Sequence, residues 1–162
     1  MFRKIMYVLL AAFIVIQFIH PAKNTSKGLQ PNTIGNNYAI PADVKTILGK
    51  ACNDCHSNNT RYPWYAKIQP VDWWMNKHVV DGKKDLNFDE FTNRAPRYQY
   101  HKMEEVIEMV KEREMPLKSY TWTHKDARLN SNEREMLTGW AQSVMDAMKV
   151  KYPVDSLIRP KR

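Results

Sequence analysis

The sequence predicts an all-α protein, and three observations lead to that prediction. Apolar residues recur at spacings of three and four in several stretches, as they do along one face of a helix. Prolines and capping residues stand where these stretches begin or end. No stretch alternates apolar and polar residues over the length of a strand.

The first helix of the domain is expected to open at Pro41, because proline fits the first turn of a helix. Its buried face is formed by Val44, Ile47, Leu48 and Ala51. Residues 57–65, which contain two adjacent asparagines and a proline, are expected to form a loop. Pro70 then opens a second helix that runs to about Asp81, and we expect Gly82 to end it.

A short turn capped by Asn87 is expected next, around two phenylalanines. A third helix near residues 99–114 carries apolar residues at i, i+3, i+4 and i+7, namely Met103, Val106, Ile107 and Val110. Pro116 forces this helix to stop, because the residue before a proline disfavours helical backbone. The segment that follows, up to about residue 129, is expected to be irregular.

The last helix is expected to begin at Asn130 or Ser131, where Glu133 can complete a capping box. It is expected to bury Met136, Leu137, Trp140, Ala141 and Val144. Residues 151–162 contain two prolines and end in basic residues, so we expect a loose tail there.

Both cysteines of the chain lie in one pentapeptide, Cys52-Asn53-Asp54-Cys55-His56. C-x-x-C-H is the attachment signal for c-type haem, in which two thiols bond the haem vinyl groups and the histidine ligates iron. A zinc site would need a second Cys or His pair, and a thioredoxin-like redox pair would need a βαβ context. The pattern therefore predicts one covalently bound haem c, held by Cys52, Cys55 and His56.

The N-terminal residues predict export of the domain. Arg3 and Lys4 precede an apolar run, residues 5–19, that is interrupted by a single glutamine. A run of this length is typical of a signal-peptide core rather than a relaxed membrane span, but the cleavage pattern around Ala22 is poor. We expect residues 1–22 to be an uncleaved signal-anchor, with a cleaved signal peptide as the alternative. The domain then lies on the periplasmic side of the inner membrane, or free in the periplasm if the leader is cleaved.

The remaining length suits one domain. Residues 23–39 are rich in Asn, Gly, Lys and Thr and are expected to form a flexible tether, which leaves residues 40–150 as the haem-binding domain. The net charge is +8, and it falls to +6 without Arg3 and Lys4. This excess suits an acidic partner or anionic lipid. It does not suggest nucleic acid, because the basic residues are scattered among acidic ones.

A sixth ligand for the iron must come from elsewhere in the chain. Met115 is the first candidate, because it follows the third helix and Pro116 fixes the backbone beside it. A thioether is a soft, neutral ligand that favours ferrous iron and raises the reduction potential. His124 is the alternative distal ligand. His78 and Met75 come next, and we expect His101 to face solvent.

Aromatic residues are abundant for a domain of this size. The five tryptophans, Trp64, Trp73, Trp74, Trp122 and Trp140, are expected mainly to pack against one another and against the helices. A haem also needs apolar walls and N–H donors for its propionates, and tryptophan and tyrosine supply both. Arg61, Tyr62 and Tyr65 follow His56 closely enough to reach a propionate.

The order of these features resembles the class I cytochrome c fold: a helix with C-x-x-C-H, further helices, a Met-Pro loop and an amphipathic last helix. A closer resemblance, over roughly residues 40–150, is to the bacterial haem-binding domain family. The residues that carry it are Cys52-x-x-Cys55-His56-Ser57-Asn58-x-Thr60, Pro63-Trp64-Tyr65, Pro70-Val71-x-Trp73-Trp74, Gly82, Leu86-Asn87-Phe88, Met115-Pro116, Tyr120, His124, Ala127-Arg128-Leu129 and Trp140. One departure is His78, where the family tends toward an acidic residue.

The family resemblance implies a small exported monohaem c-type protein, with a helical domain around one covalent haem. By analogy with class I cytochromes, it also implies that the carbonyl of Pro70, or equally of Pro63, accepts a hydrogen bond from Nδ1 of His56. It does not supply a redox partner or a substrate.

The sequence contains no catalytic constellation, so we expect an electron-transfer protein rather than an enzyme. One alternative is a haem enzyme or sensor whose sixth position is open or labile and binds peroxide or a diatomic gas. Another, without haem, is a zinc-binding or thiol-disulfide module.

Overall fold

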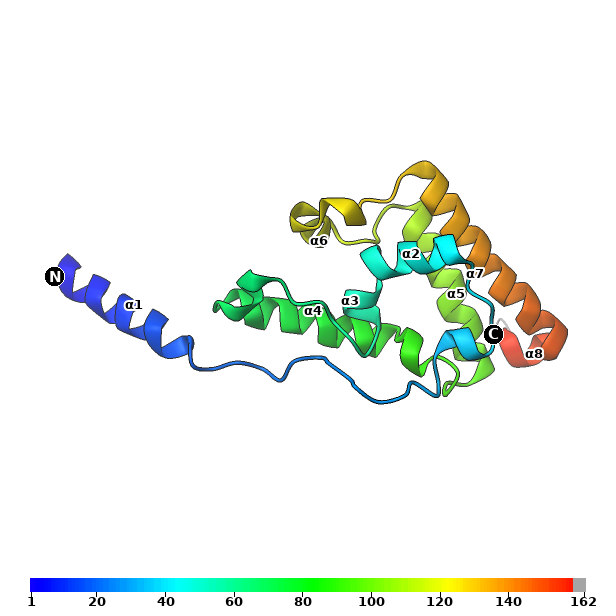
Figure 1. Cartoon of the computed structure of the whole chain (residues 1–162), viewed down its shortest axis with the longest axis horizontal. Helices are drawn as coiled ribbons and strands as arrows, with labels where there is room; N and C mark the ends of the chain where they lie inside the picture. The colour runs from blue at the N-terminus through cyan, green and yellow to red at the C-terminus, as the bar shows by residue number, and fades with distance from the viewer. Residues whose placement is uncertain (159–162) are drawn as a thin grey trace.

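The computed structural model describes residues 1–158, and all regular elements in that range are helices (Figure 1). The α-helices are α1 (Phe2–Ile16), α2 (Ala42–Ala51), α3 (Asn53–His56), α4 (Val71–Asp85), α5 (Pro96–Lys111), α6 (Lys118–Thr123), α7 (Ser131–Lys151) and α8 (Val154–Leu157). Four 3₁₀ turns connect them: η1 (Ile34–Asn36), η2 (Trp64–Lys67), η3 (Phe88–Glu90) and η4 (Lys125–Ala127). The all-α prediction is confirmed.

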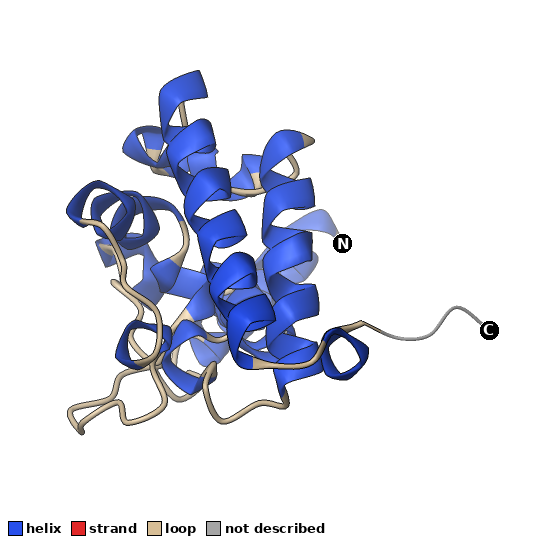
Figure 2. Ribbon diagram, turned by 90° about the vertical axis from the view of Figure 1, so that its right-hand side faces the viewer, coloured by secondary structure: helices blue, strands red, loops and turns tan. Residues whose placement is uncertain are grey.

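Helices α5 and α7 form the central pair and lie side by side (Figure 2). They run in opposite directions, since Arg134 near the start of α7 donates to the carbonyl of Val110 at the end of α5, at 3.1 Å. Helix α2 crosses α7 and buries the four apolar residues predicted for its inner face. Of the apolar residues predicted for α7, Met136 is partly buried and the other four are buried.

Local capping signals place several helix boundaries. The side chain of Asn130 accepts from the N–H of Glu133, whose carboxylate accepts from the N–H of Asn130, both at 2.9 Å. This reciprocal pair is the predicted capping box at the start of α7. The side chain of Asn87 accepts from the N–H of Asp89 at 3.0 Å, as expected for the turn η3. Helix α5 begins at Pro96, three residues before the predicted start, because proline is favoured at the first helical position.

Two segments expected to be loose are bound to the domain. Asn24 donates to the carbonyl of Ser57 at 3.0 Å and to the hydroxyl of Thr60 at 2.9 Å, and Ile34 is 1% exposed in the core. Residues 23–39 therefore follow the domain surface instead of forming a flexible tether. Near the other end, α8 packs on α5 and Leu157 is 2% exposed, so the chain up to residue 158 is not a loose tail. The rest of that tail, residues 159–162, lies outside the described residues.

The tryptophans do not pack as expected. Trp140 is buried and donates to the carbonyl of Ala39 at 3.1 Å, but the other four are exposed. They lie on η2, α4 and α6, on faces turned away from the α5–α7 core.

Helix α1 projects from one end of the domain with its apolar side chains exposed (Figure 1). In the described part of the chain, no helix combines the length and the apolar character needed to cross a membrane.

Candidate functional site

The C-x-x-C-H residues form a single helical turn, α3, directly after α2. The N–H groups of Cys55 and His56 both donate to the carbonyl of Cys52, at 3.1 and 3.0 Å. The two cysteines and the histidine are therefore fixed on one turn of backbone. They are held at the point where α2 ends and α4 passes.

Helix α3 packs against α4, and these elements and α5 enclose a cavity of about 510 Å³. Both cysteines and His56 line it. Its walls are mainly apolar and include Leu48, Leu86, Phe88, Val106, Leu117 and Leu137. A cavity of this size with few polar groups is typical of a site for an organic cofactor.

Gly82 determines how closely α3 approaches α4. A Cβ at this position would lie 2.7 Å from the carbonyl oxygen of Cys55 and 3.0 Å from its Cβ. The prediction that Gly82 ends the helix is wrong, because α4 continues through it to Asp85. The glycine is needed for close packing, not for termination.

His56 is oriented by a backbone carbonyl. Its Nδ1 lies 2.9 Å from the carbonyl oxygen of Leu86, which fixes Nδ1 as the protonated nitrogen and leaves the Nε2 lone pair free. Burial lowers the pKa of His56, so the imidazole is neutral at pH 7, as a ligand to iron must be.

The predicted partners of His56, Pro70 and Pro63, are wrong. Their carbonyls accept from the N–H groups of Trp74 and Ala66, at 3.1 and 3.0 Å. Because α4 runs past Gly82, the C-terminal end of that helix reaches His56, and the prolines lie at or before its opposite end.

Burial keeps the two thiols in their neutral, protonated form. Removal from water raises the pKa of Cys52 to about 12 and that of Cys55 to about 11, and the cysteines do not form a disulfide. Reactive and metal-binding cysteines have lowered pKa values instead. Within residues 1–158 no group of three His, Cys, Asp or Glu side chains is arranged to hold a metal ion by itself.

Met115 lies in the wall of the same cavity as Cys52, Cys55 and His56. The loop that carries it begins with a left-handed residue, Arg113, at φ 63°. The N–H of Arg113 donates to the carbonyl of Val110, and the N–H groups of Glu114 and Met115 donate to the carbonyl of Met109, at 2.9 and 3.1 Å. This pattern is the Schellman termination of a helix, and it ties Met115 to the end of α5.

His124, the alternative ligand, is not brought into this cavity. It lines a neighbouring cavity of about 300 Å³ with Met75, Trp74 and Trp122. Its ring stacks on Tyr120 with centroids 4.2 Å apart. His78 lines both cavities, and His101 is exposed beside two glutamates, as expected.

Asp54, inside the C-x-x-C-H motif, was not anticipated as a positioning residue. It is 5% exposed and accepts from the Tyr120 hydroxyl at 2.7 Å and from the N–H and Nε of Arg61 at 3.0 and 3.2 Å. Burial raises the pKa of Tyr120, so the phenol remains a donor. The network ties α3 to α6 and engages Arg61, which was expected to reach a propionate.

Two further residues of the cavity were missed from the sequence. Met109 presents a second thioether, and its spacing of three from Val106 was the available signal. Lys102 is 8% exposed and forms ion pairs with Asp85, at 2.7 Å, and with Glu105. It gives the apolar cavity one basic group at its margin.

The model of a family described as a haem-binding domain matches residues 11–143, which are 133 of the 162 residues. The chain belongs to the haem-binding domain family. No curated protein and no solved structure matches it. The match begins within α1 and includes the whole segment that runs from α1 to α2.

The cavity of this haem-binding domain fits a haem on its own geometry. It offers apolar walls for the porphyrin faces, a neutral imidazole with Nε2 free, and two thiols on the same turn as that imidazole. Lys102, at the margin of the cavity, is already paired with Asp85 and Glu105. Cys52, Cys55, His56 and Met115 are the residues of this cavity that would hold the group.

Proposed function

We propose that this haem-binding protein is a monohaem c-type cytochrome that transfers single electrons. Cys52 and Cys55 would form the two thioether bonds, His56 would ligate iron through Nε2, and Met115 would fill the sixth position. When bound, haem supplies an iron that changes between ferric and ferrous states by one electron. The observation that carries the proposal is the convergence of all four side chains on one apolar cavity.

The surrounding residues support an electron carrier because they hold the ligands still. The carbonyl of Leu86 fixes the ring of His56, the absent side chain at Gly82 lets α3 pack on α4, and the Schellman turn at Arg113 holds Met115. With both axial positions filled and the cavity walls apolar, little has to reorganise when the charge changes. The helix order also supports a class I cytochrome c-like arrangement.

We further propose that residues 1–22 keep the domain on the periplasmic side of the inner membrane. Arg3 and Lys4 precede the apolar residues of α1, and this order favours a cytoplasmic N-terminus. The partner is then another redox protein or carrier in or beside that membrane. Nothing in the spread of basic residues favours nucleic acid.

The distal ligand gives the sharpest test of the electron-carrier proposal. Met115→Ala should lower the reduction potential and allow carbon monoxide to bind ferrous haem, because a soft neutral ligand is lost. Met75→Leu is the matched control, since Met75 lines only the neighbouring cavity, and it should leave both properties unchanged. Redox titration and carbon monoxide difference spectra measure these effects.

The alternative roles give different spectra. If the wild-type ferrous protein binds carbon monoxide readily, the sixth position is open and an enzyme or sensor replaces the electron carrier. If His124→Ala, and not Met115→Ala, produces the change, the protein is a bis-histidine cytochrome.

A further inference from the structure

Four exposed tryptophans form one surface at the end of the domain next to α1. We call the surface of Trp64, Trp73, Trp74 and Trp122 the tryptophan face; their exposed fractions are 76%, 38%, 49% and 78%, against 4% for Trp140. Three of the four are linked: Trp74 and Trp122 line one cavity with Tyr65, whose ring lies 5.8 Å from that of Trp64, and Trp73 precedes Trp74 on α4. Its elements, η2, the start of α4 and α6, lie on the side of the domain from which α1 projects (Figure 1).

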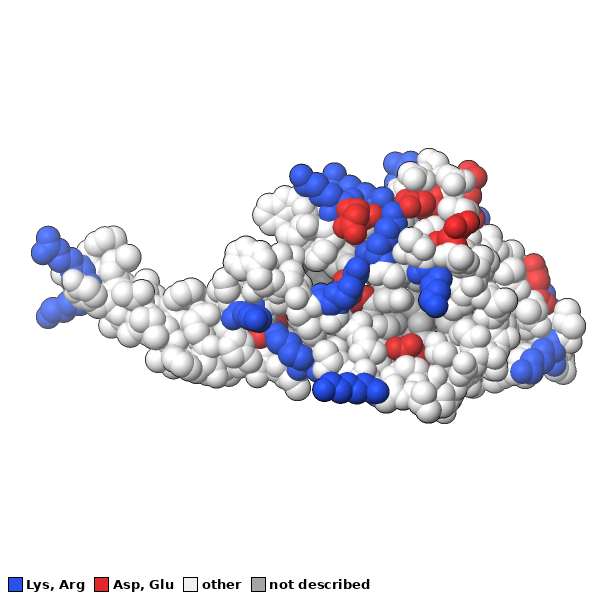
Figure 3. Space-filling model, in the orientation of Figure 1, with Lys and Arg blue, Asp and Glu red and all other residues white. Residues whose placement is uncertain are grey.

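The same segments carry mainly basic charge at their surface. Residues 61–77 contain Arg61, Lys67 and Lys77, and their single acidic residue, Asp72, is 0% exposed. Residues 117–126 contain two lysines and one exposed acidic residue, Asp126. Basic side chains are visible around α6, where acidic ones lie among them, and near the neck that joins α1 to the domain (Figure 3). Aromatic side chains with a basic surround match the interface of an anionic bilayer.

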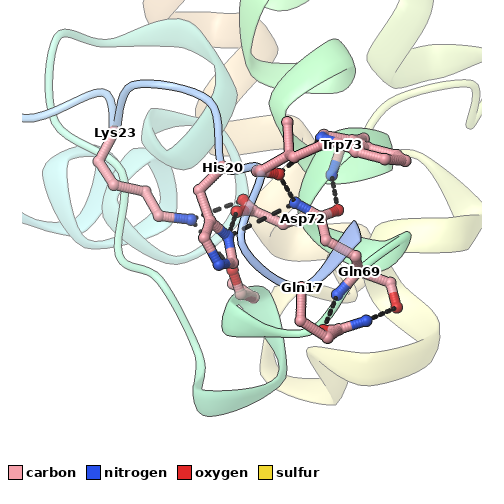
Figure 4. Close-up of polar contacts among 8 residues, drawn as sticks. Gln17, His20, Lys23, Gln69, Asp72 and Trp73 are labelled. Carbon is pink, nitrogen blue, oxygen red and sulfur yellow. Dashed lines mark hydrogen bonds and ion pairs between the residues drawn. The ribbon is translucent and has the colours of Figure 1, made fainter. Parts of the chain in front are cut away.

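The end of α1 is attached to this face by a partly buried polar network (Figure 4). Gln17 and Gln69 exchange two hydrogen bonds: the Gln69 N–H donates to Oε1 of Gln17 at 3.0 Å, and Nε2 of Gln17 donates to the Gln69 carbonyl at 3.3 Å. The carbonyl of Ile19 accepts from Nε2 of Gln69 at 2.6 Å and from the indole N–H of Trp73 at 3.0 Å. Trp73 of the tryptophan face is thus hydrogen-bonded to the segment that follows α1.

Asp72 completes the attachment. Its carboxylate accepts from Lys23 at 2.6 Å and from Nδ1 of His20 at 2.7 Å, and Lys23 also donates to the carbonyl of Ala66 at 3.0 Å. Burial opposes ionisation of Asp72, but these hydrogen bonds outweigh it and lower its pKa. We call residues 17–23 with Gln69 and Asp72 the junction. It fixes the direction of α1 relative to the tryptophan face.

The length of α1 determines how close the domain lies to the bilayer. Its 15 residues extend about 22 Å, less than the roughly 30 Å of a hydrocarbon core. A helix that enters the bilayer and is too short for it draws its flanking residues into the interfacial layer. Here the flanking surface is the tryptophan face, and tryptophan, like tyrosine, is enriched in that layer.

We infer that the tryptophan face rests in the headgroup layer of the anionic bilayer that α1 enters. The inference depends on the proposed membrane location and adds to it a defined orientation. The junction holds that orientation, so the domain does not swing on a tether. The cavity beside His124 then lies against the lipid, and the haem cavity adjoins it through Cys55, Leu117 and Tyr120.

The test uses the full-length holoprotein, labelled with 5-fluorotryptophan and reduced, in nanodiscs that contain anionic phosphatidylglycerol. Single Trp→Phe variants assign the five fluorine resonances. Doxyl-labelled lipid should broaden the resonances of Trp64, Trp73, Trp74 and Trp122 and leave buried Trp140 unchanged. If the four resonances are instead broadened by a water-soluble gadolinium chelate and not by the lipid label, the inference is wrong while membrane anchoring stands. If the protein does not remain with the nanodiscs, both fail.

Charge reversal tests the lipid chemistry. Lys118→Glu with Lys125→Glu should reduce the broadening of Trp122 by doxyl lipid several-fold. The control pair, Lys45→Glu with Lys151→Glu, reverses two exposed lysines of α2 and α7 and should have no such effect. Equal effects of both pairs would contradict a defined orientation.

Discussion

The two ends of α4 hold two different parts of the chain, one by close packing beside an apolar cavity and the other by polar contacts. At its C-terminal end, Gly82 and Leu86 hold the Cys–His turn beside a largely apolar cavity. At its N-terminal end, the buried side chains of Gln69 and Asp72 hold residues 17–23 through partly buried hydrogen bonds and ion pairs. In the described part of the chain, no buried side-chain nitrogen or oxygen lacks a hydrogen-bond partner at either end.

The pKa values of the thiols at one end and of Asp72 at the other shift differently because only Asp72 has charged partners. The thiols of Cys52 and Cys55 have no ionic partner, so burial raises their pKa values to about 12 and 11. The side chain of Asp72 is 0% exposed, but Lys23 and His20 lower its pKa. One end therefore keeps two neutral thiols beside a space for a cofactor. The other keeps a charge that fixes the position of the N-terminal segment.

The largest effect is expected where α3 and α4 touch. Gly82→Ala places a methyl group against the backbone of Cys55, which cannot move without opening the Cys–His turn. We expect a loss of about 3 kcal/mol in the free energy of unfolding, at the upper end for overpacking. Urea unfolding of the holoprotein in detergent, followed by circular dichroism, measures it.

A matched control for this change is Gly49→Ala in α2. A Cβ there would meet nothing within 4 Å, so alanine should stabilise the helix by about 0.5–1 kcal/mol. Similar losses for both variants would show that the close approach at Gly82 has no special role.

The junction is expected to be the next most sensitive region. Lys23→Ala leaves buried Asp72 with His20 alone and should cost about 2 kcal/mol, less than for a fully buried pair because Lys23 is 35% exposed. Lys27→Ala removes an exposed lysine of the same segment and should stay within about 0.5 kcal/mol of wild type. The same unfolding experiment compares them, and equal effects would mean that the N-terminal segment is not held by Asp72.

Part of the acid dependence of stability should come from the junction. Because the pKa of Asp72 is lowered by folding, its carboxylate contributes stability above its ordinary pKa of about 3.9, and this is lost as the pH falls through the lowered value. Asp72→Asn should therefore flatten the decline in unfolding free energy below about pH 4. Asp43→Asn, at an exposed position of α2, should preserve most of that decline. If the unfolding free energy of Asp72→Asn declines as steeply as that of the wild type, other carboxylates cause the decline.

The smallest expected effect lies in the loop of Met115. Arg113 adopts a left-handed conformation, at φ 63°, in which glycine is favoured. Arg113→Gly should raise the free energy of unfolding by about 0.5–1 kcal/mol. Lys111→Gly, inside α5, should lower it by a similar amount. Destabilisation by both would show that the arginine side chain itself supports the loop.

The features that the sequence could predict are local ones. The apolar spacing of α2, the capping box at Asn130 and the turn at Asn87 each depend on residues within a few positions of one another. Cys52, Cys55 and His56, which we propose bind the haem, also form a local motif. Met115 was a candidate because it follows a helix and precedes a proline, and it lines the same cavity as these three residues.

The features that the sequence could not predict depend on long-range approach. Nδ1 of His56 meets Leu86, 30 residues away, only because α4 continues through Gly82. The role of Asp72 depends on residues 49 and 52 positions earlier, Lys23 and His20. A segment rich in asparagine and lysine has the composition of a linker, and its bound state is determined by these distant partners.

The other proposals depend on covalent binding of one haem by Cys52 and Cys55. The intact mass of the full chain, purified from cells with a cytochrome maturation system and treated with acidic organic solvent, measures this attachment. We expect the mass of the chain plus one haem, and the mass of the chain alone for Cys52→Ala with Cys55→Ala. If the wild-type chain loses all its haem to the solvent, covalent attachment is wrong.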